Sequence, residues 1–130
     1  MKKIIKKLVV GTTLCMMLST TAFAAKKEFN FSLSKGNSGY TATNAKSDNE
    51  GYAYVTVTDS NLISSDKVSY VVTSSDKATN VTAGLTRNGA EPLYKQSFRY
   101  KSGYAKKGAA YRLHIKTINN SLRIEGRWNS

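Results

Sequence analysis

The stretch KQSFRYKSGYAKKGAAYRLHIK, residues 95–116, places eight basic or imidazole side chains among four aromatic ones. This mixture is typical of nucleic-acid binders, because cations neutralise phosphates and aromatic rings stack on bases. On a β-strand, however, successive side chains point to opposite faces. Phe98 and Tyr100 then lie on one face, and Lys95 and Arg99 on the other. We therefore interpret the aromatic residues as core and the cations as a surface for an anionic partner.

The predicted binding surface consists of the outward-facing cations of the last three strands. These are Lys95, Arg99, Lys101, Arg112, Lys116, Arg123 and Arg127. Residues 87–130 hold ten basic side chains against Glu91 and Glu125, whereas residues 25–86 hold six of each sign. Such asymmetry favours a partner of opposite charge. The alternative is that the cations only blunt exposed sheet edges or maintain solubility.

Catalytic and metal-binding patterns are weak. His114 is the only histidine and is expected to face Glu125, a pair that can serve as a general base, but no nucleophile accompanies it. A cross-strand surface pair is the favoured interpretation. Asp48-Asn49-Glu50-Gly51 has oxygen ligands too closely spaced for a calcium loop and is typical of a turn. We expect no enzyme activity, no cofactor and no metal.

The first residues predict secretion. Lysines at the start precede a mostly apolar run at residues 8–18, and Ala22-Phe23-Ala24 is typical of a cleavage site. We predict a signal peptide at residues 1–24 and a single domain at residues 25–130, secreted and extracellular or associated with the cell wall. Cys15, the only cysteine, lies in the signal, so the domain has no disulfide.

This location decides between partners. Nucleic acid is scarce outside the cell, so we expect an anionic cell-wall polymer or a membrane surface and no specific nucleic acid. The apolar run of the signal is too short for a membrane span, so no integral span is expected after cleavage.

Apolar and polar residues alternate with period two along most of the domain, which predicts β-strands. Residues 36–50 are polar and predict a long loop or a weak strand around Tyr40. The sequence SSDK occurs at residues 64–67 and 74–77 and predicts two similar turns on either side of a strand at Val68–Thr73. About seven short strands indicate an all-β fold, an antiparallel β-sandwich rather than a solenoid. The predicted strands are Phe29–Leu33, Gly51–Thr58, Val68–Thr73, Thr79–Arg87, Tyr94–Lys101, Tyr111–Ile118 and Leu122–Trp128.

The last two strands are expected to pair as a hairpin. Asn119-Asn120 fits a two-residue type I′ loop, because Asn tolerates positive φ. The resulting register places Arg112 opposite Arg127 and Lys116 opposite Arg123, and His114 opposite Glu125. Like charges directly opposite each other destabilise a sheet, so this arrangement favours a binding role for the face.

The closing segment YRLHIKTINNSLRIEGRW, together with the lysine-led signal ending TTAFA, resembles a family of small secreted proteins of Gram-positive bacteria whose function is unknown. In that family an Asn-rich turn precedes a last strand ending in Gly-x-Trp, as Gly126-Arg127-Trp128 does here. Its members are similar in size and composition to secreted β-sandwich bacteriocins of the lactococcin type. The resemblance implies no catalytic residues. Two functions remain open: a non-enzymatic protein that binds anionic envelope components through a basic sheet face, or a bacteriocin-like antimicrobial protein.

Overall fold

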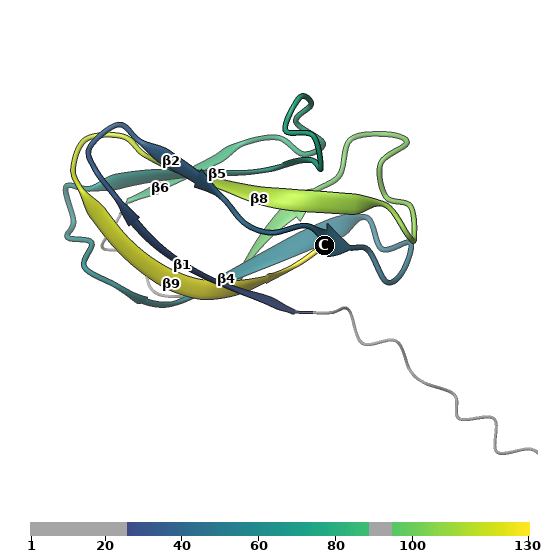
Figure 1. Cartoon of the computed structure of the whole chain (residues 1–130), viewed down its shortest axis with the longest axis horizontal. Helices are drawn as coiled ribbons and strands as arrows, with labels where there is room; N and C mark the ends of the chain where they lie inside the picture. The colour runs from purple at the N-terminus through teal and green to yellow at the C-terminus, as the bar shows by residue number, and fades with distance from the viewer. Residues whose placement is uncertain (1–25, 89–94) are drawn as a thin grey trace, which may run out of the picture.

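Two antiparallel β-sheets lie one above the other in the computed structural model of the chain, which describes residues 26–88 and 95–130 (Figure 1). This confirms the predicted all-β sandwich. The predicted signal peptide, its cleavage point and Pro92 lie outside the described residues.

The four-stranded sheet has the order β1-β9-β4-β7 and forms the lower layer in Figure 1. Its strands are β1 (Lys27–Leu33), β9 (Leu122–Asn129), β4 (Tyr52–Ser60) and β7 (Lys95–Arg99). β4 contains a bulge between Val57 and Asp59, where its register with β9 shifts. The extra residue turns Asp59 to the outer face, directly opposite Glu125, because a shift of one residue exchanges the two faces of a strand.

The five-stranded sheet has the order β2-β8-β5-β6, and β3 pairs with β8 next to β2. Its strands are β2 (Ser38–Tyr40), β8 (Ala110–Thr117), β5 (Lys67–Ser74), β6 (Leu85–Asn88) and β3 (Asn44–Ala45). Residues 41–43 separate β2 from β3. In this gap the Thr41 hydroxyl accepts a hydrogen bond from the Leu113 N–H at 3.0 Å. This segment is the weak strand predicted around Tyr40.

The core lies between the sheets and is built from the alternating apolar residues. Trp128, Leu113, Ile115 and Ile124 are fully buried, and Phe98 is almost so. The period-two pattern therefore predicted correctly which side chains of β7, β8 and β9 point inward. Burial of these apolar side chains is the main stabilising contribution to the sandwich.

The predicted hairpin of the last two strands is wrong. β8 pairs with β5 and β2, and β9 pairs with β1 and β4, so the segment 118–121 crosses from one sheet to the other. Among the described residues Lys77 is the only non-glycine with positive φ, so Asn119 and Asn120 do not adopt the type I′ conformation. Asn119 instead accepts a hydrogen bond from the Lys67 N–H at 2.9 Å and donates to Ser65 O at 2.6 Å. Its amide ties the crossing segment to the loop before β5.

The predicted strand Thr79–Arg87 is only partly correct. β6 covers Leu85–Asn88, and the residues before it form isolated bridges at Asn80 and Thr82. Val81 is buried but Ala83, two residues further on, is exposed, so the alternation of a strand does not hold through this segment. Gly84 follows, and a glycine inside a strand pattern weakens pairing because it has no side chain to pack.

Candidate ligand-binding surface

The structure separates the seven predicted cations instead of collecting them on one face. Lys95, Arg99, Arg123 and Arg127 lie on the outer face of the four-stranded sheet, and Arg112 and Lys116 lie on the outer face of the five-stranded sheet. Lys101 lies in the loop after β7, where its N–H donates to Val81 O at 2.9 Å. The predicted single basic face, with Arg112 opposite Arg127 and Lys116 opposite Arg123, is therefore wrong, because β8 and β9 belong to different sheets.

On the four-stranded sheet the cations meet carboxylates. Arg123 Nη1 lies 3.0 Å from Asp59 Oδ2 and 3.7 Å from Glu125 Oε1. Arg127 lies opposite Glu28 in the register of β9 with β1. Because three acidic residues stand among four basic ones, this face presents little net charge to a partner.

The outer face of the five-stranded sheet is different. Its outward positions carry Lys67 on β5 and Arg112 and Lys116 on β8, and no outward position of β2, β5, β6 or β8 carries an acidic residue. Lys77, in the turn after β5, lies over the same face, with Nζ 4.8 Å from the centre of the Tyr40 ring. The neighbouring carboxylate, Asp76, accepts the Ala78 N–H within that turn. We call Lys67, Lys77, Arg112 and Lys116 the basic face.

Arg112 has a structural role on the basic face. Its Nε donates to Ser75 O at 2.8 Å, and its Nη1 donates to Thr41 O at 2.9 Å. The guanidinium thus links the turn after β5 to the chain between β2 and β3. Planar, multiple donors suit arginine to such a bridge. The ammonium groups of Lys67, Lys77 and Lys116 therefore remain as candidate ligand contacts, and Arg112 adds positive charge to the face.

An aromatic stack lies beside these cations. The Tyr40 and His114 rings are nearly parallel, with centres 4.1 Å apart. Nε2 of His114 is buried without a hydrogen-bond partner within the described part of the chain. Burial of the ring, together with the positive charge of Lys116, lowers the pKa of His114 below its ordinary value. The imidazole is therefore neutral at physiological pH.

The predicted pairing of His114 with Glu125 is wrong. Glu125 lies on the other sheet, where it accepts a hydrogen bond from Asn30 Nδ2 at 3.0 Å. No group of three or more His, Cys, Asp or Glu side chains able to hold a metal ion lies within residues 26–88 and 95–130.

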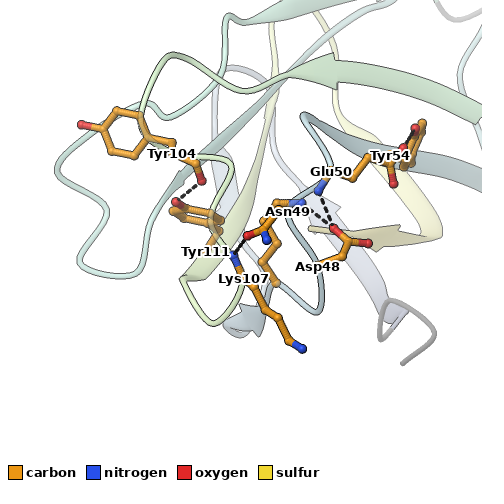
Figure 2. Close-up of polar contacts among 8 residues, drawn as sticks. Asp48, Asn49, Glu50, Tyr54, Tyr104, Lys107 and Tyr111 are labelled. Atoms are coloured by element: carbon orange, nitrogen blue, oxygen red, sulfur yellow. Dashed lines mark hydrogen bonds and ion pairs between the residues drawn. The ribbon is translucent and has the colours of Figure 1, made fainter. Parts of the chain in front are cut away.

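Lys46, directly after β3, is a buried lysine that was not among the predicted functional residues. The Lys46 side chain is 0% exposed, and its Nζ lies 2.9 Å from Asp48 Oδ1. The same oxygen accepts the Glu50 N–H at 2.9 Å, which confirms the turn predicted for this segment (Figure 2). The hydrogen bond from Lys46 holds the pKa of Asp48 below its ordinary value.

Neighbouring loops contact this segment. The Lys107 N–H donates to Asn49 Oδ1 at 2.8 Å, and the Tyr111 hydroxyl donates to Tyr104 O at 2.6 Å (Figure 2). Lys46 Nζ also lies 4.9 Å from the centre of the Tyr100 ring. These contacts tie the loop 100–109 to the loop after β3, so we assign this cluster to fold stability.

Sequence reasoning missed Tyr40, Lys67 and Lys77 as members of the surface. One signal was present, because Lys67 and Lys77 are the lysines of the two SSDK copies. The copies form turns as predicted: Asp66 accepts the Ile63 N–H at 3.0 Å, and the Lys77 N–H donates to Ser74 O at 2.9 Å. The repeat thus places one lysine at each end of β5.

The fold and surface define a two-sheet β-sandwich with one basic outer face and one charge-balanced outer face. Comparison of the chain with protein-family models, curated proteins and solved structures finds no match. The resemblance to small secreted proteins of Gram-positive bacteria stays a prediction. No helix long and apolar enough to span a membrane occurs in the part of the chain that the structure describes.

Proposed function

We propose that the protein is a secreted, non-enzymatic protein that binds an anionic polymer of the cell envelope through the basic face. The observation that carries this proposal is the absence of acidic residues from the outward positions of β2, β5, β6 and β8, which hold Lys67, Arg112 and Lys116. Because the outward strand positions hold cations and no carboxylates, they produce a positive potential that attracts and retains polyanions. Secretion rests on the signal peptide predicted from residues 1–24.

A matched pair of double variants tests the proposal. Lys67→Gln with Lys116→Gln removes two charges from the basic face, and Lys95→Gln with Arg127→Gln removes two from the other sheet. Binding of the purified protein to isolated cell walls is measured across a salt series. We expect the first variant to weaken binding roughly tenfold or more, at about 1 kcal/mol for each lysine near an anionic surface. The second should change it less than threefold, since charges beyond a Debye length of about 8 Å are screened.

Equal weakening by the two variants would mean that net charge alone governs binding, and the basic face would have no special role. Retained binding by both, with the fold intact, would reject the basic face as the binding surface, and failure of the wild-type protein to bind cell walls would reject envelope binding altogether. Circular dichroism on each variant establishes that the fold is intact.

A membrane-directed, bacteriocin-like role is the second candidate, and one observation favours it. Ile63 and Ile118 are 62% and 42% exposed. They lie at the same end of the sandwich, because the Ile118 N–H donates to Lys67 O at 3.1 Å, close to the loop that carries Ile63. Exposed apolar side chains beside lysines suit the interface of an anionic bilayer. Co-sedimentation with phosphatidylglycerol vesicles, lost in Ile63→Ser with Ile118→Ser, would support this role over polymer binding.

A further inference from the structure

A groove of about 530 Å³ borders the basic face between the end of β1 and strand β2. β1 is an edge strand of one sheet and β2 of the other, and the turn 34–37 joins them at the left of Figure 1. The turn is fixed by two backbone hydrogen bonds, from Asn37 N–H to Ser34 O at 2.9 Å and from Thr117 N–H to Asn37 O at 3.1 Å. The groove is therefore part of the folded framework.

Phe31 holds the two edges together beside this groove. A Cβ added to Gly39 would lie 2.8 Å from Phe31 Cδ1, so the ring packs directly against the backbone of β2. This contact sets the spacing between β1 and β2, which gives the groove its width.

The side chains that line the groove are mostly hydroxylic or amidic. They include Ser32, Ser34, Asn37 and Ser38, with Lys116 as the cation among the lining residues. None of these five side chains has a hydrogen-bond or ion-pair partner within residues 26–88 and 95–130. The groove thus offers several unused donors and acceptors and one positive charge.

The stacked rings supply the rest of the wall. Tyr40 and His114 both line the groove, and they lie on strands β2 and β8 of the basic face. Lys77 Nζ lies over the Tyr40 ring, so a second ammonium group stands near the groove. The groove therefore adjoins the basic face, and a long polymer can contact both at the same time.

We propose that this groove binds one repeat of the anionic polymer, a hydroxylated unit that carries a single phosphate or carboxylate. The inference rests on the proposed function and specifies its substrate class. Serine hydroxyls and the Asn37 amide pair with ligand hydroxyl groups, each as donor or acceptor. Lys116 pairs with the anionic group through a charge-assisted hydrogen bond. The remaining lysines of the basic face hold neighbouring repeats by charge.

Calorimetric titration of the purified protein with three polymers tests this inference. The polymers are poly(glycerol phosphate), polygalacturonate and linear inorganic polyphosphate, compared at equal anion concentration and ionic strength. The first two carry hydroxyl groups and one charge per repeat, as phosphate or carboxylate, and polyphosphate carries charge without hydroxyl groups. We expect at least one hydroxylated polymer to bind about tenfold more tightly than polyphosphate.

Two matched variant pairs locate the binding. Lys116→Gln in the groove is compared with Lys67→Gln on the same face outside it, and Asn37→Ala with Asn88→Ala at the end of β6. We expect about tenfold weaker binding for Lys116→Gln and two- to fivefold for Asn37→Ala, typical losses for charged and neutral hydrogen bonds. Lys67→Gln removes a charge from the basic face, so it should weaken binding of all three polymers alike, by about fivefold, whereas Lys116→Gln should weaken binding of the hydroxylated polymers more than that of polyphosphate. Asn88→Ala should change the affinity by less than about twofold. Neither groove substitution removes a side-chain hydrogen bond or ion pair within the described residues.

The outcomes separate this inference from the proposed function. If all three polymers bind equally and each groove variant matches its control, the basic face binds polyanions by charge alone and the groove proposal is rejected. If no polymer binds, the proposed function fails, and the groove proposal fails with it.

Discussion

For the buried pair Lys46–Asp48 we predict that replacing Asp48 lowers the free energy of unfolding much more than replacing Lys46. The Lys46 side chain is 0% exposed and that of Asp48 is 40% exposed, with 2.9 Å between Nζ and Oδ1. Removing the carboxylate leaves a buried ammonium group unpaired, which costs about 3 kcal/mol of unfolding free energy. Removing the ammonium leaves a carboxylate that water already reaches. We therefore expect Asp48→Asn to destabilise strongly and Lys46→Met to stay within about 1 kcal/mol of the wild type.

Asn at position 48 keeps an oxygen to accept the Glu50 N–H, so the substitution changes charge more than shape. Urea unfolding of the two single variants and of the double variant measures the effect. We expect the double variant to recover most of the loss, because it contains no unpaired buried charge. If Lys46→Met costs as much as Asp48→Asn and the double variant recovers nothing, the charge-pair reasoning is refuted.

Three other predictions follow from contacts in the fold. Replacing Asn119 with Gly removes its hydrogen bonds with Ser65, in the loop before β5, and with Lys67, the first residue of β5. It should cost about 1–2 kcal/mol in chemical denaturation, whereas a type I′ hairpin would gain stability. Gly126→Ala adds a Cβ 2.7 Å from Phe29 Cζ and against Thr56 O, and thermal melts should show a loss of about 2 kcal/mol or more. Because the pKa of His114 is lower in the folded protein than in the unfolded chain, a falling pH protonates the unfolded chain before the folded protein. The free energy of unfolding therefore decreases as the pH drops below 6.5. His114→Phe should flatten that fall in pH-dependent unfolding, and an unchanged slope would contradict it.

The alternation of apolar and polar residues along each strand was enough to predict much of the fold. The inward and outward side chains of the last strands were predicted correctly because a strand exposes alternate residues whichever strand it pairs with. The residues that alternate with the predicted outward cations, among them Tyr111, Leu113, Ile124 and Trp128, are buried. The SSDK turns were also predicted, since Ser and Asp bond to the backbone within a few residues.

This alternation did not predict which strands pair, and the proposed binding surface depends on that pairing. The segment Ile118–Ser121 connects two well-patterned strands whether they form a hairpin or lie in different sheets. Its asparagines bond to residues more than fifty positions away in the chain, such as Ser65, Asp66 and Lys67, and a local pattern contains no sign of that. Once β8 and β9 separate, the charge surplus of the last third is divided. The basic face then depends on lysines from the middle of the chain.

Amide chemical-shift mapping during titration of the ¹⁵N-labelled protein with poly(glycerol phosphate) reports on both outer faces at once and so locates the surface that binds the polymer. We expect shifts confined to the basic face and the adjoining groove, at Tyr40, Lys67, His114 and Lys116. The outward residues of β4 and β7, and Arg127 on β9, should be unaffected. Shifts centred on β9 and β4, or spread evenly over both sheets, would contradict the assignment of the basic face as the binding surface.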